Sequence, residues 1–553
     1  MNKNKYLLLF SSLGVLILLV AAAVSENFFK EWQSIQKVSK TSEGPIDTRL
    51  RQIVTPSLRS TDRCVSCHVG MAPGEQITSS LAVAGVHKPV VHSPGEMGCT
   101  VCHGGQGLAT EKDAAHGNVD FWPEPMLPAK YAYASCGTCH TPLNVPNLPM
   151  LEAAKNTFEK LDCYSCHRVE GRGGTLRVGG FGGMEGPDLS AIGIKGYNID
   201  WYTGHSQNSQ QAVDGPWKTS FREISDADRE SLKIYLGTLM GAWKLIEAKA
   251  QFNTLGCTGC HKVGSFGGDG GPDLSLEGQK DPGQLNYQNV HGDHTLSNWL
   301  VQHFRSPVST VAGSQMPALG LSDEQIDLLT MYMLSLRRRS LPDIFLPKDR
   351  LRALRFGEHE FALNGATIYT AVCSSCHGAD GRGNRFAGIS PYPSITNPDF
   401  LSLASDDFLF QTINKGRPGR PMLAWGEREN GFTADEIKAV IAYIRQLGGN
   451  ISPPADNMPQ IWAKGNVDLG ARMFASNCSG CHGKTGQGAD GPALNNKVFL
   501  ATVTDTFLVN TISQGRRGTV MQGFANPSPT RRELTKGEIE SIAVYIRSLT
   551  SKR

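Results

Sequence analysis

The chain of 553 residues has no cysteine outside one repeated pattern. It also has almost no net charge, and it contains one long hydrophobic run. A formal net charge of +3 shows neither a basic nor an acidic excess, so nothing in the composition indicates a nucleic-acid partner. Only 40% of the residues are hydrophobic, while 61 are glycine and 30 are proline. Such a chain is expected to form several small domains rather than one large core.

The repeated pattern is C-x-x-C-H, and it occurs seven times. A structural zinc site would need two such pairs, or one pair with spaced histidines, and would not need His after every second Cys. Disulfides between cysteines three positions apart would cross-link nothing useful. C-x-x-C-H is the attachment site of c-type haem, in which two thiols add to the vinyl groups of one porphyrin and the histidine becomes the proximal iron ligand. The sequence therefore predicts seven covalently bound haem c groups. The cysteines are Cys64, Cys67, Cys99, Cys102, Cys136, Cys139, Cys163, Cys166, Cys257, Cys260, Cys373, Cys376, Cys478 and Cys481, and the histidines are His68, His103, His140, His167, His261, His377 and His482.

The long hydrophobic run lies at the N-terminus. Residues 6–24 carry no charge and follow Lys3 and Lys5, which predicts a membrane-spanning helix with a cytoplasmic N-terminus. A cleaved signal peptide is the alternative, with Ala21–Ala23 as its processing site. The length of the run favours an uncleaved anchor in the cytoplasmic membrane. Either interpretation puts the haem domains on the periplasmic side.

The last four motifs lie in internal repeats. Each repeat opens with a short amphipathic helix before the cysteines: "LEAAKNTFEKLDCYSCH", "AKAQFNTLGCTGCH", "GATIYTAVCSSCH" and "LGARMFASNCSGCH". Each closes with a helix that begins with a capping box: "SDADRESLKIYLGTL", "SDEQIDLLTMYMLSL", "TADEIKAVIAYIRQL" and "TKGEIESIAVYIRSL". A tyrosine recurs in the closing helix, and we predict that all four pack in helix cores: Tyr235, Tyr332, Tyr443 and Tyr545.

An opening helix, C-x-x-C-H, a glycine-rich loop, a methionine and a closing helix resemble the class I mono-haem cytochrome c fold over residues 150–553. The resemblance implies a mainly α protein. The predicted domains are a transmembrane anchor (1–25), a helical stalk (26–49), a loop-rich tri-haem module (50–148) and four cytochrome c-like helical domains. These four domains are expected at 149–247, 248–340, 341–452 and 453–553.

That resemblance also implies a distal methionine ligand late in each domain. The matching residues are Met316 in "QMPALG", Met422 in "GRPGRPMLAWG" and Met521 in "GRRGTVMQGF". Met422 and Met521 share an upstream "I-x-x-G-R-x-G". A lone methionine is more often core filler, but three in the same place before a closing helix favour ligation.

The tri-haem module contains three histidines outside its haem motifs: His87, His92 and His116. Three haems and three such histidines predict bis-histidine irons, without showing which histidine serves which haem. The run from "DRCVSCH" to "CGTCH" resembles membrane-anchored multihaem c subunits of bacterial cytochrome b-type quinol-oxidising complexes. This weaker resemblance implies a cytochrome b-type or other quinol-oxidising membrane partner.

The first cytochrome c-like domain has lysine where its neighbour has methionine. Lys218 follows Trp201 at the same spacing as Met316 follows Trp299. Only the neutral amine can bind iron, and deprotonating a lysine at pH 7 costs roughly 4–5 kcal/mol. Ligation by Lys218 and an open iron both remain possible for the Cys163 haem, with Met184 or His205 as substitute ligands.

Axial ligands set the reduction potential of a haem, and His/Met ligation raises it relative to bis-histidine. The sequence therefore predicts an electron-transfer protein with low-potential haems near the membrane and higher-potential haems further out. Its acceptor would be a periplasmic protein or a terminal oxidase. No catalytic residue is assigned. The alternative is a multihaem enzyme of the peroxidase or nitrite reductase type, with an open iron at the Cys163 haem.

Overall fold

The computed structural model describes the chain from residue 2 to residue 549 with interruptions. Outside the description lie residues 1, 73, 78, 82, 88–89, 91, 141–147, 166, 170–171, 174–185, 187, 196–223, 240, 265, 338–341, 347–363, 387–390, 428–430, 455–457, 530 and 550–553. The fold is mainly α, as predicted, and the only strands in the described part form four two-stranded antiparallel hairpins.

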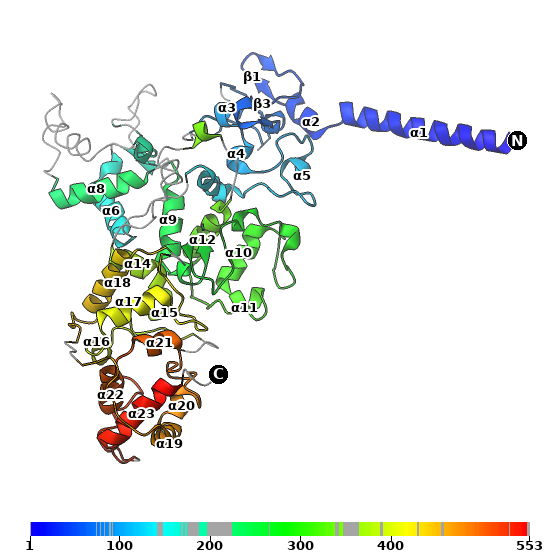
Figure 1. The fold of residues 1–553 in the computed structure, drawn as a ribbon. Helices are drawn as coiled ribbons and strands as arrows, with labels where there is room; N and C mark the ends of the chain where they lie inside the picture. Colours follow the sequence, from blue (N-terminus) through cyan, green and yellow to red (C-terminus); the bar gives the residue numbers. More distant parts are fainter. Residues whose placement is uncertain are drawn as a thin grey trace.

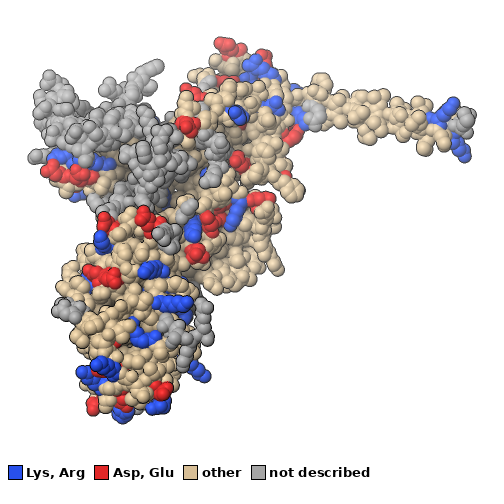
Figure 2. All heavy atoms as spheres, viewed as in Figure 1, with Lys and Arg blue, Asp and Glu red and all other residues tan. Residues whose placement is uncertain are grey.

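Helix α1 (Asn2–Phe28) projects away from the rest of the molecule (Figure 1). Its segment Lys3–Ser25 has a mean hydropathy of 2.8 and no buried residue, so it is long and apolar enough to cross a membrane. Figure 2 shows no charged side chain along the middle of this helix and basic side chains at its free end. Elsewhere on this face basic and acidic side chains are intermixed.

The tri-haem module is built from short elements joined by loops. Buried Asp62 connects its first two haem motifs, because its carboxylate accepts hydrogen bonds from the Cys99 amide and the Thr100 hydroxyl, both at 2.7 Å. The elements are α2 (Glu31–Lys37), β1 (Lys40–Thr41), β2 (Gly44–Pro45), β3 (Ile53–Thr55), η1 (Pro56–Leu58), β4 (Ser60–Asp62), η2 (Cys64–Ser66), α3 (Pro94–Met97), α4 (Thr100–His103), α5 (Lys112–Ala115) and η3 (Ala129–Thr138).

Each of the four repeats packs its opening helix against its closing helix. The pairs are α6 (Leu148–Lys160) with α8 (Asp226–Thr238), α9 (Trp243–Thr254) with α12 (Asp323–Ser335), α14 (Gly365–Ile368) with α18 (Ala434–Leu447), and α19 (Val467–Asn477) with α23 (Lys536–Ser548). An aromatic ring before the cysteines meets the recurring tyrosine in every pair. The ring centroids are 4.9 Å apart for Phe158–Tyr235, 5.0 Å for Phe252–Tyr332, 5.5 Å for Tyr369–Tyr443 and 5.3 Å for Phe474–Tyr545. The predicted core role of the four tyrosines is confirmed.

The other elements connect these pairs. They are η4 (Cys163–Ser165), β5 (Arg168–Val169), β6 (Arg172–Gly173), η5 (Ile192–Lys195), η7 (Cys257–Gly259), β7 (Lys262–Val263), β8 (Phe266–Gly267), η8 (Glu277–Gln279), η9 (Pro282–Gln284), α10 (Leu296–Arg305), α11 (Pro307–Thr310), η10 (Asp343–Phe345), η11 (Tyr369–Cys373), α15 (Ser374–His377), α16 (Pro398–Leu401), α17 (Asp406–Lys415), α20 (Ser479–His482), α21 (Lys497–Thr502) and α22 (Asp505–Gln514).

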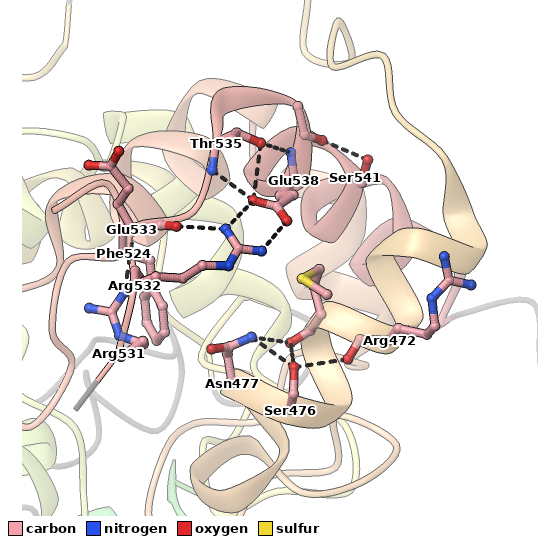
Figure 3. Close-up of polar contacts among 12 residues, drawn as sticks. Arg472, Ser476, Asn477, Phe524, Arg531, Arg532, Glu533, Thr535, Glu538 and Ser541 are labelled. Atoms are coloured by element: carbon pink, nitrogen blue, oxygen red, sulfur yellow. Dashed lines mark hydrogen bonds and ion pairs between the residues drawn. The ribbon is translucent and has the colours of Figure 1, made fainter. Parts of the chain in front are cut away.

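The four closing helices begin with a serine or threonine whose side chain accepts a hydrogen bond from the third helical amide. These residues are Ser225, Ser322, Thr433 and Thr535. At α23 the Glu538 carboxylate accepts from the Thr535 amide at 2.8 Å and also pairs with Arg532 (Figure 3). The Arg532 hydrogen bond is the main reason why the pKa of Glu538 falls to about 2, and the Thr535 amide lowers it further.

Replacing Thr535 by alanine should destabilise α23 by about 1 kcal/mol, because the cap satisfies an amide that has no partner within the helix. Hydrogen exchange of α23 peptides in the full-length protein measures this local stability. Lys536→Ala is the control, since the exposed Lys536 side chain makes only a long contact of 3.8 Å with Glu540. Equal exchange rates in the two variants would contradict the prediction.

The tri-haem module contacts the second repeat directly. Helix η3, which contains the first cysteine of the third haem motif, packs against α12 and α9 of the second repeat. Tyr131 on η3 donates a hydrogen bond to Asp327 at 2.7 Å, and Lys130 pairs with the same carboxylate at 2.8 Å. The second, third and fourth repeats share one core with η3, while the first repeat has a small core of its own around Phe158. The first repeat therefore lies beside this line of domains (Figure 1).

Candidate haem sites

Each haem motif forms one helical turn. In six motifs the histidine amide donates to the carbonyl of the first cysteine at 2.8–3.0 Å. The seventh, at Cys373, lies on α15 and the end of η11. The turn brings both thiols and the imidazole of a motif into one local arrangement, as haem attachment requires. Cys166 lies outside the described residues.

The structure pairs every additional histidine of the tri-haem module with a motif histidine. The ring centroids are 6.3 Å apart for His68–His116, 6.1 Å for His87–His103 and 6.0 Å for His92–His140. Two metal–nitrogen bonds of about 2 Å, with half a ring on either side, separate imidazole centres by about 6 Å. Each pair therefore has the spacing that one iron between two imidazoles requires. The sequence has three such histidines for three predicted haems, and the fold places one of them near each motif histidine.

Burial and neighbouring charge favour the neutral imidazole that an iron ligand must be. The pKa of His103 is lowered by burial and then by His87 and His68. The pKa of His116 is lowered by burial and then by His68. The shared influence of His68 also shows that the first two iron sites are close neighbours.

Carbonyl oxygens orient the proximal histidines of the last three domains. Nδ1 lies 3.0 Å from the Pro272 carbonyl in His261, 3.0 Å from that of Pro393 in His377, and 2.8 Å from that of Pro492 in His482. His68 has the same contact with the Val83 carbonyl at 3.0 Å. A hydrogen bond at Nδ1 leaves Nε2 for the iron and fixes the ring. Sequence reasoning missed these partners, although "GPDL" at 271–274 and "GPAL" at 491–494 recur after the motifs.

The three predicted distal methionines lie in loops before the closing helices, and Met316 and Met422 pack against the shared core. The Arg417 amide donates to the Met422 carbonyl at 2.7 Å, and the Arg516 amide donates to the Met521 carbonyl at the same distance. Both turns therefore fix their methionine in the same way. Lys218, Met184 and His205 lie outside the described residues, so the distal ligand of the Cys163 haem stays a prediction.

His303 lies on α10 of the second repeat. Its ring stacks on Trp299 with centroids 4.8 Å apart. Its pKa is lowered to about 4, first by burial and then by His261. The neutral ring therefore lies in the haem pocket region of the second repeat.

Among the described residues, two pairs of haem motifs meet at their cysteines. The side chains of Cys64 and Cys99 are neighbours between the first two motifs, and those of Cys260 and Cys376 between the second and third repeats. At the second contact Gly256 and Gly259 lie directly against Ser375, and Phe266 packs on Phe432 with centroids 5.4 Å apart. The attachment edges of two neighbouring haems would meet at each of these thiol pairs.

Family models match the repeats. Residues 246–337 and 467–550 match the model for cytochrome c, and residues 360–444 match the model for subunit III of cbb3-type cytochrome c oxidase. The chain therefore contains cytochrome c-type domains in its second, third and fourth repeats.

Curated relatives match a third or more of this chain. The cbb3-type cytochrome c oxidase subunit FixP of Bradyrhizobium diazoefficiens is 32% identical over 198 residues, which cover 34% of the chain and 60% of the relative. Subunit CcoP of an Azospirillum species is 27% identical over 236 residues, which cover 39% of the chain and 70% of the relative. The chain thus spans less than two thirds of the length of the first relative.

Among solved structures, the reducing HAO-like protein complex of Kuenenia stuttgartiensis aligns at a TM-score of 0.24 and 18% identity. The alignment covers 34% of this chain and 94% of that chain, and the likeness is too small to indicate a common fold.

Proposed function

We propose that this cytochrome is a membrane-anchored heptahaem electron carrier with one haem c at each C-x-x-C-H motif. It takes electrons from a membrane quinol through a cytochrome b-type partner and passes them to a periplasmic acceptor or a terminal oxidase. The single observation that carries the proposal is the set of three histidine pairs, 6.0–6.3 Å apart, in the module next to the anchor helix. They provide closed, bis-histidine irons, which suit electron transfer rather than substrate binding.

The haem ligands form a gradient along the molecule. Bis-histidine irons near α1 have low potentials, and the irons paired with Met316, Met422 and Met521 have higher ones. Electrons therefore move outward from the membrane. Residues 50–148 accept them, and the repeats that contain the three methionines deliver them.

Contacts between motifs define the path within the chain. The Cys64–Cys99 contact joins the first two haem sites, and the packing of η3 on α12 leads from the third site to the second repeat. The Cys260–Cys376 contact then leads to the third repeat. On this path electrons do not pass through the Cys163 haem, although its motif lies between the tri-haem module and the second repeat in the sequence. Ligation of its iron by Lys218 remains part of the proposal.

The likeness to FixP and CcoP supports a respiratory membrane partner. FixP and CcoP are named as subunits of cbb3-type cytochrome c oxidases. The terminal-oxidase version of the proposal follows from this likeness, and the quinol-oxidising version follows from the tri-haem module.

Membranes that contain the chain should reduce its haems when a quinol analogue is added, whereas the purified full-length chain should not be reduced at a comparable rate. Haem absorbance during stopped-flow mixing measures both rates. An intact mass seven haem masses above the polypeptide is the control for complete loading. Rapid reduction of peroxide or nitrite by the purified chain would contradict the proposal and favour an enzyme.

A further inference from the structure

The third and fourth repeats meet through the same face of each. Arg417 in the third repeat and Arg516 in the fourth occupy the same position of the shared "I-x-x-G-R-x-G". The Arg417 guanidinium lies over Phe408 of its own repeat at 5.5 Å and over Phe499 of the fourth at 5.6 Å. The Arg516 guanidinium lies over Phe507 of its own repeat at 5.7 Å and over Phe400 of the third at 5.0 Å.

Two asparagines extend this symmetry. Asn397 donates to the Arg517 carbonyl at 2.9 Å, and its counterpart Asn496 donates to the Pro418 carbonyl at 3.1 Å. Both asparagines also cap the helix that follows them, α16 or α21. The seam between the repeats therefore has an approximate twofold relation, with one arginine on either side.

These arginines lack the carboxylates that buried guanidinium groups ordinarily pair with. Among the described residues neither forms an ion pair, and Asp399, whose charge acts on Arg516, is paired with Arg517 at 2.7 Å. Arg417 donates to Thr412 at 2.7 Å, but its Nη1 is buried without a hydrogen-bond partner, and so is Nε of Arg516. Burial lowers the pKa of both guanidinium groups to about 10.

The surroundings of both arginines indicate which anion pairs with their guanidinium groups. Each begins the turn that ends at a distal methionine, through the amide-to-carbonyl bonds to Met422 and Met521. Both guanidinium groups therefore belong to haem pockets. A haem c carries two propionate carboxylates, and a guanidinium binds a carboxylate with two parallel hydrogen bonds.

We propose that Arg417 and Arg516 bind the propionates of the haems attached at Cys373/Cys376 and at Cys478/Cys481. The propionate edges of both haems then face the seam, and electrons cross from the third repeat to the fourth there. This inference rests on the haem attachment of the proposed function. Intact mass checks that attachment separately.

Arg417→Gln and Arg516→Gln in the full-length chain test the inference by potentiometric titration. Loss of the cation leaves the propionate charge uncompensated, which favours the oxidised haem. In each variant one of the seven potentials should fall, with about a tenfold shift toward the oxidised form, or about 59 mV for one electron. Arg517→Gln is the matched control, since Arg517 is exposed and paired with Asp399, and it should leave all potentials unchanged.

A merely structural role has a different signature. If the Gln variants lose thermal stability but keep all seven potentials, the arginines only fasten the phenylalanines of the seam, and the inference is wrong. If the Gln variants do not mature, Arg417→Lys decides, because it keeps the charge and changes the hydrogen bonds. A smaller shift of the same potential supports propionate binding, and unchanged potentials overturn it.

Discussion

Replacing His116 by methionine should raise the reduction potential of the haem at Cys64 and Cys67. The potentials of the other six haems should not change. The His116 and His68 ring centroids are 6.3 Å apart, so we propose that both imidazoles bind one iron. A methionine or an open position donates less electron density than imidazole and disfavours the oxidised iron. The rise should be a sizeable fraction of the ~0.8 V range that axial ligands span.

Potentiometric titration followed by haem absorbance measures the change, and carbon monoxide binding reports an open sixth position. His294→Met is the matched control, because the His294 ring stacks on Tyr287 with centroids 4.5 Å apart and is not paired with a haem motif. If His116→Met leaves the lowest potentials unchanged, His116 is not a ligand. If it moves the potential assigned to Cys99/Cys102 instead, the pairing is wrong.

The sequence predicts the attachment chemistry from a pattern that is local. C-x-x-C-H is a single helical turn, and the capping boxes at Ser322, Thr433 and Thr535 are complete within four residues. The structure has these three where the pattern predicted. The capping box predicted at Ser225 is wrong, because Asp228 accepts from the Ser225 hydroxyl at 2.8 Å and only the serine cap forms. The recurring tyrosines were found for the same reason, since their spacing within the closing helix is fixed.

What the sequence could not give depends on contacts between distant segments. His92 lies 48 residues before His140, and no spacing rule would choose it over His87 or His116 as the partner. The packing of the tri-haem module on the second repeat also depends on distant residues, because η3 presents Tyr131 and Lys130 to Asp327.

The opening and closing helices of the fourth repeat cross at a glycine. A Cβ added at Gly470 would lie 2.9 Å from Cβ of Tyr545 and still closer to the Ser541 carbonyl oxygen. That oxygen belongs to the backbone of α23, so it cannot move without shifting the helix. The close approach also sets the packing of Phe474 on Tyr545. The absence of a side chain at residue 470 is therefore a requirement of the crossing.

Gly470→Ala should destabilise the fourth repeat by about 1–3 kcal/mol. The steric clash at the helix crossing destabilises the repeat more than the higher helix propensity of alanine stabilises it. Hydrogen exchange of α19 and α23 peptides in the full-length holoprotein measures the loss in both helices, and the third repeat should be unaffected. Gly537→Ala is the matched control on α23, where nothing lies within 4 Å of the added Cβ. There the same substitution should stabilise the helix by a few tenths to about 1 kcal/mol, since alanine is the better helix former. If Gly470→Ala lowers stability and Gly537→Ala raises it, the contact between the two helices, and not helix propensity, determines the effect of a side chain at residue 470. Stabilisation by both would mean that α19 and α23 do not approach as closely as the structure has them.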